Sequence, residues 1–331
     1  PLLLEGPAPA NTPPTRERSD YVEVVAGVIR DARGRILHAR RTEGRDLAGL
    51  WEFPGGKHEP GESAEAALAR ELHEGLGIDV EIGAPLITVP QAYPHKRLRL
   101  DVREVKAWRG AVRGREGQAL AWVPLAQLAR YAMPPADVPV VAALQQPDRY
   151  LVTPDPGDDD AAWLSALERA LAFGVRRVQL RAPDCEPTRW ARLVDAAVAR
   201  WRAADAQVLV NSDIELALRH EVGVHLRASQ LAALTTRPLP EGMLVAASCH
   251  DAHELRMTQA LGCDFAVVGT VQPTLSHPGS PALGWDGFAA LREGVSLPLY
   301  AIGGLGPDDM AEARRHGAQG IAAIRGLWPG G

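Results

Sequence analysis

The sequence predicts two domains of different fold class, an α+β domain followed by an α/β domain built as a (β/α)8 TIM barrel. The chain has 331 residues, too many for one ordinary hydrophobic core. In its first part, strand-like segments surround a single strong helical segment, whereas in its second part strand-like and helical segments alternate strictly. The predicted divisions are a disordered tail at 1–20, the α+β domain with its linker at 21–147, and the barrel at 148–331.

The strongest helical signal of the first domain is SAEAALARELHEGLG, residues 63–77. Its apolar residues recur at helical spacing, and Gly77 is suited to end the helix. Around it lie predicted strands at 21–30, 35–40, 98–108 and 119–125, the first two joined as a hairpin by the turn DARG, and short helices at 125–131 and 136–144.

The second domain follows a linker, QQPDR, at 145–149. Its eight strand candidates are mostly continuous apolar runs joined by helices, which is typical of a parallel sheet closed into a barrel. The segment is short for this fold, so some connections must be short. The predicted strands are 150–153, 177–181, 208–211, 223–226, 244–249, 265–269, 298–304 and 320–324.

Charge and composition exclude several classes of protein. The net charge of -5 argues against binding of polymeric DNA or RNA, because a nucleic-acid backbone rewards a basic surface. No apolar run approaches the roughly 18 residues of a membrane span. The three cysteines lack metal-ligand spacing, so we expect small buried residues in a reducing cytoplasm. HKRLRLDVR, residues 95–103, offers positive charge for a single nucleotide, or else the solvated face of a strand.

Carboxylates in the predicted helix suggest chemistry at its surface. Glu71 and Glu74 are three residues apart and therefore share a face. The preceding FPGGKHEPGE is rich in glycine, which would let backbone carbonyls approach a cation. Carboxylates beside such a turn suit Mg²⁺, and a cluster of this kind can hydrolyse a pyrophosphate. Solvated glutamates on an exposed helix face would show the same spacing.

A longer pattern around the helix resembles the Nudix box, GX5EX7REUXEEXGU. Gly56 is followed after five residues by Glu62, after seven more by REL at 70–72, then by Glu74 and by GI at 77–78. The resemblance implies the Nudix fold, a mixed sheet that carries the Nudix helix. It also implies that Glu62 and Arg70 brace the loop against the helix.

Within the Nudix superfamily, residues 21–143 are similar to the MutT-type 8-oxo-dGTP diphosphatases through WEFPGGK, REGQ and PPAD as well as the box. The resemblance implies Mg²⁺, with Mn²⁺ as an alternative, and a nucleoside triphosphate substrate. The implied residues are Glu71 and Glu116 for catalysis, Gly55, Glu71, Glu74 and Glu116 for the metal, and Arg41, Phe53 and Asp137 for the substrate.

Two residues depart from this pattern. Gly75 stands where the box has a metal-binding glutamate, so we expect a raised Mg²⁺ requirement and a loss of turnover. Asp137 replaces the asparagine that reads the oxidised base; an ionised carboxylate only accepts hydrogen bonds, whereas an amide also donates them.

The second domain carries its own candidate residues. Gly303 and Gly304 follow a predicted strand, where free backbone N–H groups would cradle a phosphate, although a tight turn also favours this pair. The barrel segments, among them VQLR, VLVNSDIELAL, GVHL and GTVQPTLSHPG, resemble thiamine phosphate synthase and its relative TenI. The resemblance implies ligand contacts by Gln179, Arg181, Asn211 and His250.

Several synthase residues are missing, however. RAPD replaces the segment with an expected lysine, Ser212 replaces a Mg²⁺-binding aspartate, RASQ at 227–230 replaces the region of a second ligand, and a further lysine is replaced around His277. We therefore expect a non-synthase relative that binds a thiamine precursor or supports the first domain.

Three hypotheses follow for the whole chain. The first is Mg²⁺-dependent hydrolysis of an oxidised purine nucleoside triphosphate to the monophosphate and pyrophosphate. The second is hydrolysis of thiamine-type diphosphates. The third is a binding or regulatory protein in which Gly75 has silenced the hydrolase site.

Overall fold

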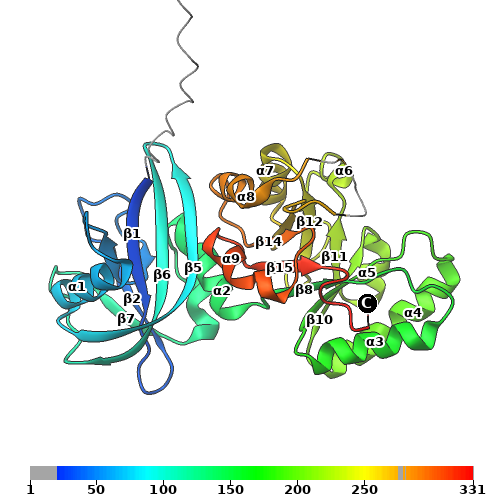
Figure 1. The fold of residues 1–331 in the computed structure, drawn as a ribbon, viewed down its shortest axis with the longest axis horizontal. Helices are drawn as coiled ribbons and strands as arrows, with labels where there is room; N and C mark the ends of the chain where they lie inside the picture. Colours follow the sequence, from blue (N-terminus) through cyan, green and yellow to red (C-terminus); the bar gives the residue numbers. More distant parts are fainter. Residues whose placement is uncertain (1–20, 275–278, 280, 331) are drawn as a thin grey trace, which may run out of the picture.

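The computed structural model describes residues 21–274, 279 and 281–330. The expected tail at 1–20 and the position of His277 lie outside these residues. An N-terminal domain of long strands lies beside a barrel, and β5, α2, α8 and α9 meet where the two come together (Figure 1).

The N-terminal domain is built on two small sheets, in agreement with the predicted mixed α+β fold. In the first sheet β1 runs parallel to β6 and antiparallel to β4, while β5 pairs antiparallel with β6 and forms the edge. The strands of this sheet, in order, are β4 (Gly55–Lys57), β1 (Tyr21–Val28), β6 (Lys96–Arg109) and β5 (Asp79–Tyr93). The second sheet consists of β3 (Trp51–Glu52), β2 (Ile36–Arg40) and β7 (Leu120–Val123).

Two features of this domain differ from the predictions. The DARG turn forms, but the strands that flank it diverge into different sheets after a single bridge between Arg30 and Ile36. The 15-residue strand β5 was not predicted, because Gly83, Pro85 and Pro90 interrupt its pattern. Register shifts near Ile82 and Pro85 let the strand accommodate these residues.

The predicted helix is α1 (Ala64–Leu76), and local chemistry sets both of its ends. The Ser63 hydroxyl accepts a hydrogen bond from the Ala66 N–H at 3.1 Å, as an N-cap residue does. Gly77 ends the helix in the left-handed conformation. The apolar stripe packs against the first sheet by burying Ala67, Leu68, Leu72 and Leu76. The carboxylates of α1 are thereby turned away from the core.

Residues 125–145 close the N-terminal domain. The predicted short helices are two 3-10 turns, η1 (Leu125–Arg130) and η2 (Pro135–Asp137), followed by α2 (Val138–Gln145). Only residues 146–148 then separate α2 from the first barrel strand.

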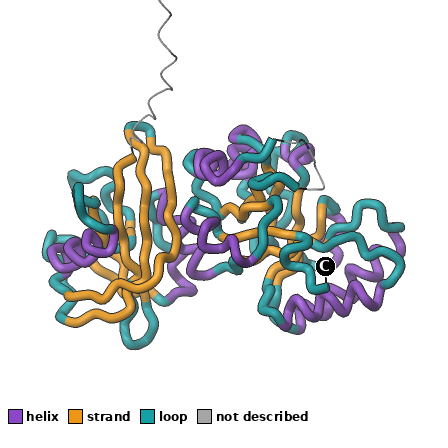
Figure 2. Tube along the Cα trace, viewed as in Figure 1, coloured by secondary structure: helices purple, strands orange, loops and turns teal. Residues whose placement is uncertain are grey.

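The second domain is a closed barrel of eight parallel strands, which confirms the predicted architecture (Figure 2). Every strand pairs with its sequence neighbour, and β15 closes the ring onto β8. The strands are β8 (Arg149–Val152), β9 (Arg177–Leu180), β10 (Gln207–Asn211), β11 (Gly223–Leu226), β12 (Val245–Cys249), β13 (Phe265–Val268), β14 (Leu299–Ile302) and β15 (Gly320–Ala323).

The connections of the barrel are unequal in length, as the short chain segment requires. α5 has seven residues and α6 only four, whereas α4 has seventeen. The helical elements are α3 (Asp160–Ala172), α4 (Pro187–Ala203), α5 (Ile214–His220), α6 (Ala228–Leu231), α7 (Ala252–Leu261), α8 (Gly284–Arg292), η3 (Pro307–Asp309) and α9 (Met310–Arg315).

No helix within the described part of the chain is long and apolar enough to cross a membrane. Cys249 is buried as expected, but Cys185 and Cys263 are only half-buried, and all three are free thiols. In the basic segment 95–103 the charges are paired: Arg99 with Glu23, Arg103 with Glu65 and Asp101, and Arg97 with Glu293 of the barrel.

Candidate active site

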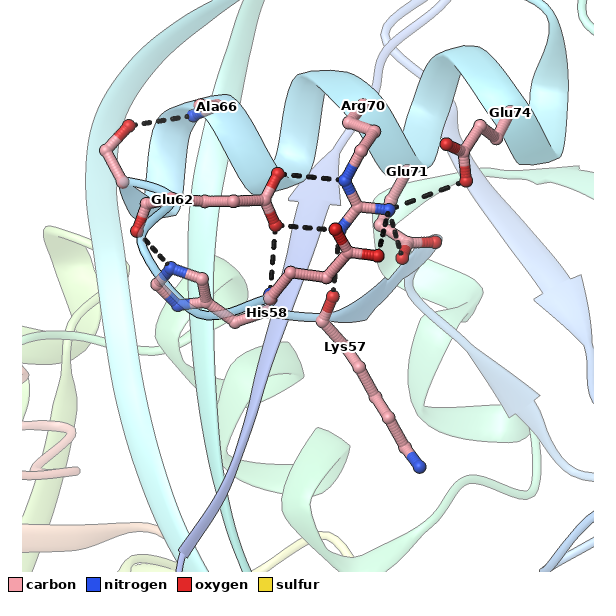
Figure 3. A network of polar contacts seen from close by, with 9 residues as sticks. Lys57, His58, Glu62, Ala66, Arg70, Glu71 and Glu74 are labelled. Carbon is pink, nitrogen blue, oxygen red and sulfur yellow. Dashed lines mark hydrogen bonds and ion pairs between the residues drawn. The ribbon is translucent and has the colours of Figure 1, made fainter.

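Arg70 organises the loop that precedes α1 (Figure 3). Its Nε and Nη2 atoms donate to the two Glu62 carboxylate oxygens, each at 2.8 Å. Nη2 also donates to the Lys57 carbonyl at 3.1 Å, while the Glu59 N–H donates to Glu62. These charge-assisted bonds lower the pKa of Glu62 to about 2. The brace expected between Glu62 and Arg70 is therefore present, and it ties the loop to the helix.

The same guanidinium also reaches the two candidate metal-binding glutamates of α1. Arg70 Nη1 lies 3.0 Å from Glu71 Oε1 and 3.5 Å from Glu74 Oε2. Burial raises the pKa of Glu71, although Arg70 opposes that shift. A raised pKa makes a carboxylate a stronger proton acceptor.

Gly56 provides the space in which the Glu71 carboxyl group lies. A Cβ atom at residue 56 would come within 2.2 Å of the Glu71 carboxyl carbon. At Gly55 a Cβ would lie 1.8 Å from the Val25 carbonyl oxygen in the neighbouring strand. Gly55 and Gly56 are thus both required by close approach, which accounts for the glycine-rich turn.

A small polar pocket of about 30 Å³ brings together Gly55, Glu71, Gly75 and Glu116. Within the described residues, no group of three or more His, Cys, Asp or Glu side chains is placed to hold a metal ion. The donor chemistry nevertheless fits a hard cation, because carboxylates and a glycine carbonyl share one pocket. Glu74 lies outside this lining, with its side chain 58% exposed.

Gly75 leaves open space in this pocket. Among the described atoms around it, the nearest to an added Cβ would be Gln118 Nε2, at 4.0 Å. The Gly75 carbonyl accepts hydrogen bonds from Gln118 Nε2 at 3.1 Å and from the Arg115 N–H at 3.0 Å. The loop bearing Glu116 is therefore docked onto the last turn of α1, and a Cβ atom at position 75 would meet no clash.

A second pocket, of about 110 Å³, adjoins the first and shares Arg45, Glu52 and Gly55 with it. The three residues predicted to bind substrate all line this second pocket: Arg41, Phe53 and Asp137. Arg41 Nη1 donates to Glu52 Oε2 at 2.6 Å, and Phe53 is buried.

Asp137 is the most unusual group in this second pocket. It is 5% exposed, and its Oδ2 atom has no hydrogen-bond partner among the described residues. Burial, reinforced by nearby Glu52 and opposed by Arg41, raises the pKa of Asp137 well above its usual range. A carboxyl group that keeps its proton can both donate and accept hydrogen bonds, which an ionised one cannot.

Tyr93 and Lys96 also line this pocket, and sequence reasoning missed both of them. They pair across the end of the β5–β6 hairpin. Burial raises the pKa of Tyr93 to about 12. Lys96 belonged to a segment whose basic character was noted, but its position could not be derived without β5.

The six residues predicted for the barrel lie at the C-terminal ends of its strands. Asn211 Nδ2 donates to Gln179 Oε1 at 2.8 Å, which joins β10 to β9. Arg181, after β9, and His250, after β12, are both exposed. The His250 Nδ1 atom lies 3.0 Å from Glu254 Oε1. Gly303 and Gly304 follow β14 with φ values of 115° and 67°.

Near these residues lies a polar chain that sequence reasoning also missed. His225 is fully buried and hydrogen-bonds Tyr150 Oη at 2.9 Å and Ser248 Oγ at 2.8 Å. Burial lowers the pKa of His225 to about 3, so its ring is neutral. The only signal in the sequence was a histidine inside the apolar strand GVHL, a position that core packing alone also permits.

Local hydrogen bonds hold the chain on both sides of Ser212. The adjacent Asp213 caps α5 by accepting a hydrogen bond from the Leu216 N–H at 3.0 Å. In RASQ, Gln230 donates to the Ser212 carbonyl at 2.9 Å and accepts from the Arg227 N–H at 2.8 Å. Both segments are thus held by local hydrogen bonds.

Comparison with known proteins agrees with this two-part architecture. Residues 149–327 match the thiamine monophosphate synthase family, and residues 25–143 match the NUDIX domain family. The chain is 39% identical over 122 residues to a CTP pyrophosphohydrolase of Escherichia coli, covering 37% of this chain and 90% of the relative. It is 41% identical over 124 residues to an 8-oxo-dGTP diphosphatase of Haemophilus influenzae, with 37% and 90% coverage.

The barrel has relatives of its own. It is 36% identical over 185 residues to a putative thiamine-phosphate synthase of Geobacter sulfurreducens, covering 54% of this chain and 85% of the relative. The chain therefore belongs to the Nudix hydrolases through its N-terminal domain, fused to a C-terminal domain of the thiamine monophosphate synthase family.

Proposed function

We propose that the N-terminal domain hydrolyses nucleoside triphosphates to the monophosphate and pyrophosphate, with 8-oxo-dGTP as its principal substrate, and so sanitises the nucleotide pool. The observation that carries this proposal is Asp137, a buried carboxyl group with a raised pKa in a pocket that adjoins the candidate phosphate site. 8-Oxoguanine presents an N7–H donor beside its O6 acceptor. A neutral carboxyl group complements that pair, as an asparagine amide would.

Nudix hydrolases generally use divalent metal ions such as Mg²⁺, and the Gly55 carbonyl, Glu71, Glu74 and Glu116 would hold the ion here. When bound, the ion neutralises charge on the phosphates and activates water. Glu71 or Glu116 would accept the proton of the attacking water. Arg70 would have to release Glu71 and Glu74 in part for both to face a cation.

CTP is a second candidate substrate, supported by the same carboxyl group. Cytosine presents an amino donor beside its N3 acceptor, the same pairing that suits a neutral Asp137. A relative of the N-terminal domain is a CTP pyrophosphohydrolase. On its N7/O6 edge unmodified guanine presents two adjacent acceptors, so dGTP should be a poorer substrate than 8-oxo-dGTP if Asp137 reads that edge.

The barrel is proposed to lack synthase activity, because Ser212 stands in place of a metal-binding carboxylate and Asp213 is used as a helix cap. A thiamine precursor remains its proposed ligand. The domain boundaries, the tail at 1–20 and a cytoplasmic location likewise stay as proposals.

Pyrophosphate release from 8-oxo-dGTP, dGTP, CTP and thiamine diphosphate, in Mg²⁺ and in Mn²⁺, tests the proposal. Preferential turnover of 8-oxo-dGTP supports the sanitising role, and preferential turnover of CTP supports the second candidate. Turnover of thiamine diphosphate alone would overturn both. If no compound is turned over even after Gly75→Glu, the chain is not a working hydrolase, and calorimetry with thiamine phosphate would test a binding role.

A further inference from the structure

The barrel contacts the N-terminal domain beside the pocket lined by Arg41, Phe53 and Asp137, which is called the nucleotide pocket below. β5 is the edge strand of its sheet, and α8 and α9 of the barrel pack against it (Figure 1). An uncovered edge strand exposes unpaired backbone N–H and C=O groups. A domain that packs on this edge can therefore form hydrogen bonds with the backbone as well as with side chains.

Glu293, the C-cap residue of α8, makes most of these polar contacts. Its carbonyl oxygen accepts from the Ala92 N–H at 3.0 Å and from Gln91 Nε2 at 3.1 Å. Its carboxylate accepts from Arg97 in a bidentate pair, with Nε–Oε1 at 2.9 Å and Nη2–Oε2 at 3.1 Å. The carboxylate is largely buried, because its side chain is only 11% exposed.

These contacts adjoin the pocket directly. Ala92 precedes Tyr93 in β5, and Arg97 follows Lys96 in β6; Tyr93 and Lys96 both line the nucleotide pocket. Because side chains alternate along a strand, Arg97 points away from the pocket while Leu98 lines it. Glu293 therefore contacts both the edge strand β5 and Arg97 in a hairpin whose Tyr93, Lys96 and Leu98 form a pocket wall.

A second set of contacts holds the wall that carries Asp137. Gln319 of the barrel is buried, and its Nε2 atom donates to the carbonyls of Ala142 at 3.0 Å and Gln146 at 3.1 Å. Both carbonyls belong to the C-terminal end of α2, the helix that follows Asp137. The two walls that carry Tyr93 and Asp137 are thus each fastened to the barrel.

We propose that the barrel is a positioning scaffold for the nucleotide pocket, and that Glu293 is the positioning residue that sets the β5–β6 wall. The expected effect of this scaffold on nucleotide turnover rests on the proposed function. The contacts between the barrel and the hairpin do not depend on any activity. Glu293 does not line the pocket, so its effect must pass through Arg97 and the hairpin.

The test compares Glu293→Gln with Arg97→Lys in the full chain. Glutamine keeps the volume and the backbone contacts but loses the charge, and lysine keeps the charge but cannot form a bidentate pair. Each variant should raise KM for the preferred nucleotide by about fivefold to tenfold with little change in kcat, because the wall is displaced and not the reacting groups. The double variant should be no worse than the single ones, since both remove one pair.

Glu168→Gln is the control, because it makes the same substitution in a glutamate–arginine pair that lies wholly within the barrel, with Arg200 at 3.4 Å. Hydrogen exchange of residues 86–98 supplies a readout that needs no substrate: it should speed up in both test variants and not in the control. Unchanged exchange together with unchanged KM overturns the inference. Failure of the wild-type chain to turn over any nucleotide would instead overturn the proposed function, while the exchange result would still decide the anchoring.

Discussion

At the scale of single residues, the missing ligand at Gly75 is the first point to test. Gly75→Glu would add a carboxylate at a residue that lines the small polar pocket, where an added Cβ meets no described atom closer than 4.0 Å. We expect turnover to rise by about tenfold or more, about 1.4 kcal/mol of barrier, with a lower Mg²⁺ requirement. Gly75→Ala is the control: it should stabilise the helix by roughly 1 kcal/mol without raising activity. Steady-state kinetics over a Mg²⁺ series separates ligation from helix propensity.

Asp137 permits a second test at this scale. Burial raises the pKa of Asp137. As pH rises through that pKa, the carboxyl group loses the proton that it donates to the base, so kcat/KM should fall. Asp137→Asn should stay within about tenfold of wild type but lose this limb of the pH profile. Asp137→Leu should cost on the order of a hundredfold, because the base edge is left unpaired. The same limb in the pH profiles of wild type and of Asp137→Asn would remove Asp137 from base recognition.

At the scale of elements, α1 carries Glu71 and Glu74, two of the candidate metal-binding carboxylates, and its N-terminus is capped by Ser63. Ser63→Ala removes the hydrogen bond to the Ala66 N–H and should lower the free energy of unfolding by about 1 kcal/mol. Urea unfolding monitored by circular dichroism measures this loss. Ser63→Asp keeps an acceptor and should restore the stability, whereas an equal loss in both variants would show that the cap contributes nothing.

The elements also show where sequence patterns were sufficient and where they failed. The stripe and the caps of α1 are local, and the helix lies where its periodicity predicts. The strand β5 was missed because Pro85 and Pro90 disfavour a strand on local grounds. Edge position and register shifts remove that penalty, but both depend on the neighbouring strand β6.

At the scale of the whole molecule, each domain buries a neutral histidine. Burial lowers the pKa of His38 to about 4 and that of His225 to about 3, below the usual value of 6.5. Between about pH 6.5 and 4 the unfolded chain therefore binds more protons than the folded one, so stability is complete above pH 6.5 and is lost as pH falls. The slope is up to about 1.4 kcal/mol per pH unit for each histidine. The raised pKa of Asp137 acts in the opposite direction.

His38→Leu tests this acid sensitivity, because both ring nitrogens of His38 lack a partner in the described part of the chain. Between pH 7 and 5 the free energy of unfolding should depend less steeply on pH in the variant than in wild type. The difference in slope should correspond to at most one proton. Urea titrations at pH 7, 6 and 5 give the slope directly. If the free energy of unfolding has the same pH slope in both proteins, His38 binds its proton equally well in the folded and the unfolded chain.

The sequence by itself determined the two fold classes, the Nudix box with its glycine at position 75, and the serine at position 212, because periodicity and spacing are local properties of the chain. Only the tertiary structure decided the raised pKa of Asp137 and the contacts of Glu293 with the β5–β6 hairpin. Burial fixes the first, through desolvation that depends on every surrounding element. The contacts of Glu293 involve Gln91 and Arg97, two residues of the other domain. These residues lie beside Glu293 only when both domains have folded.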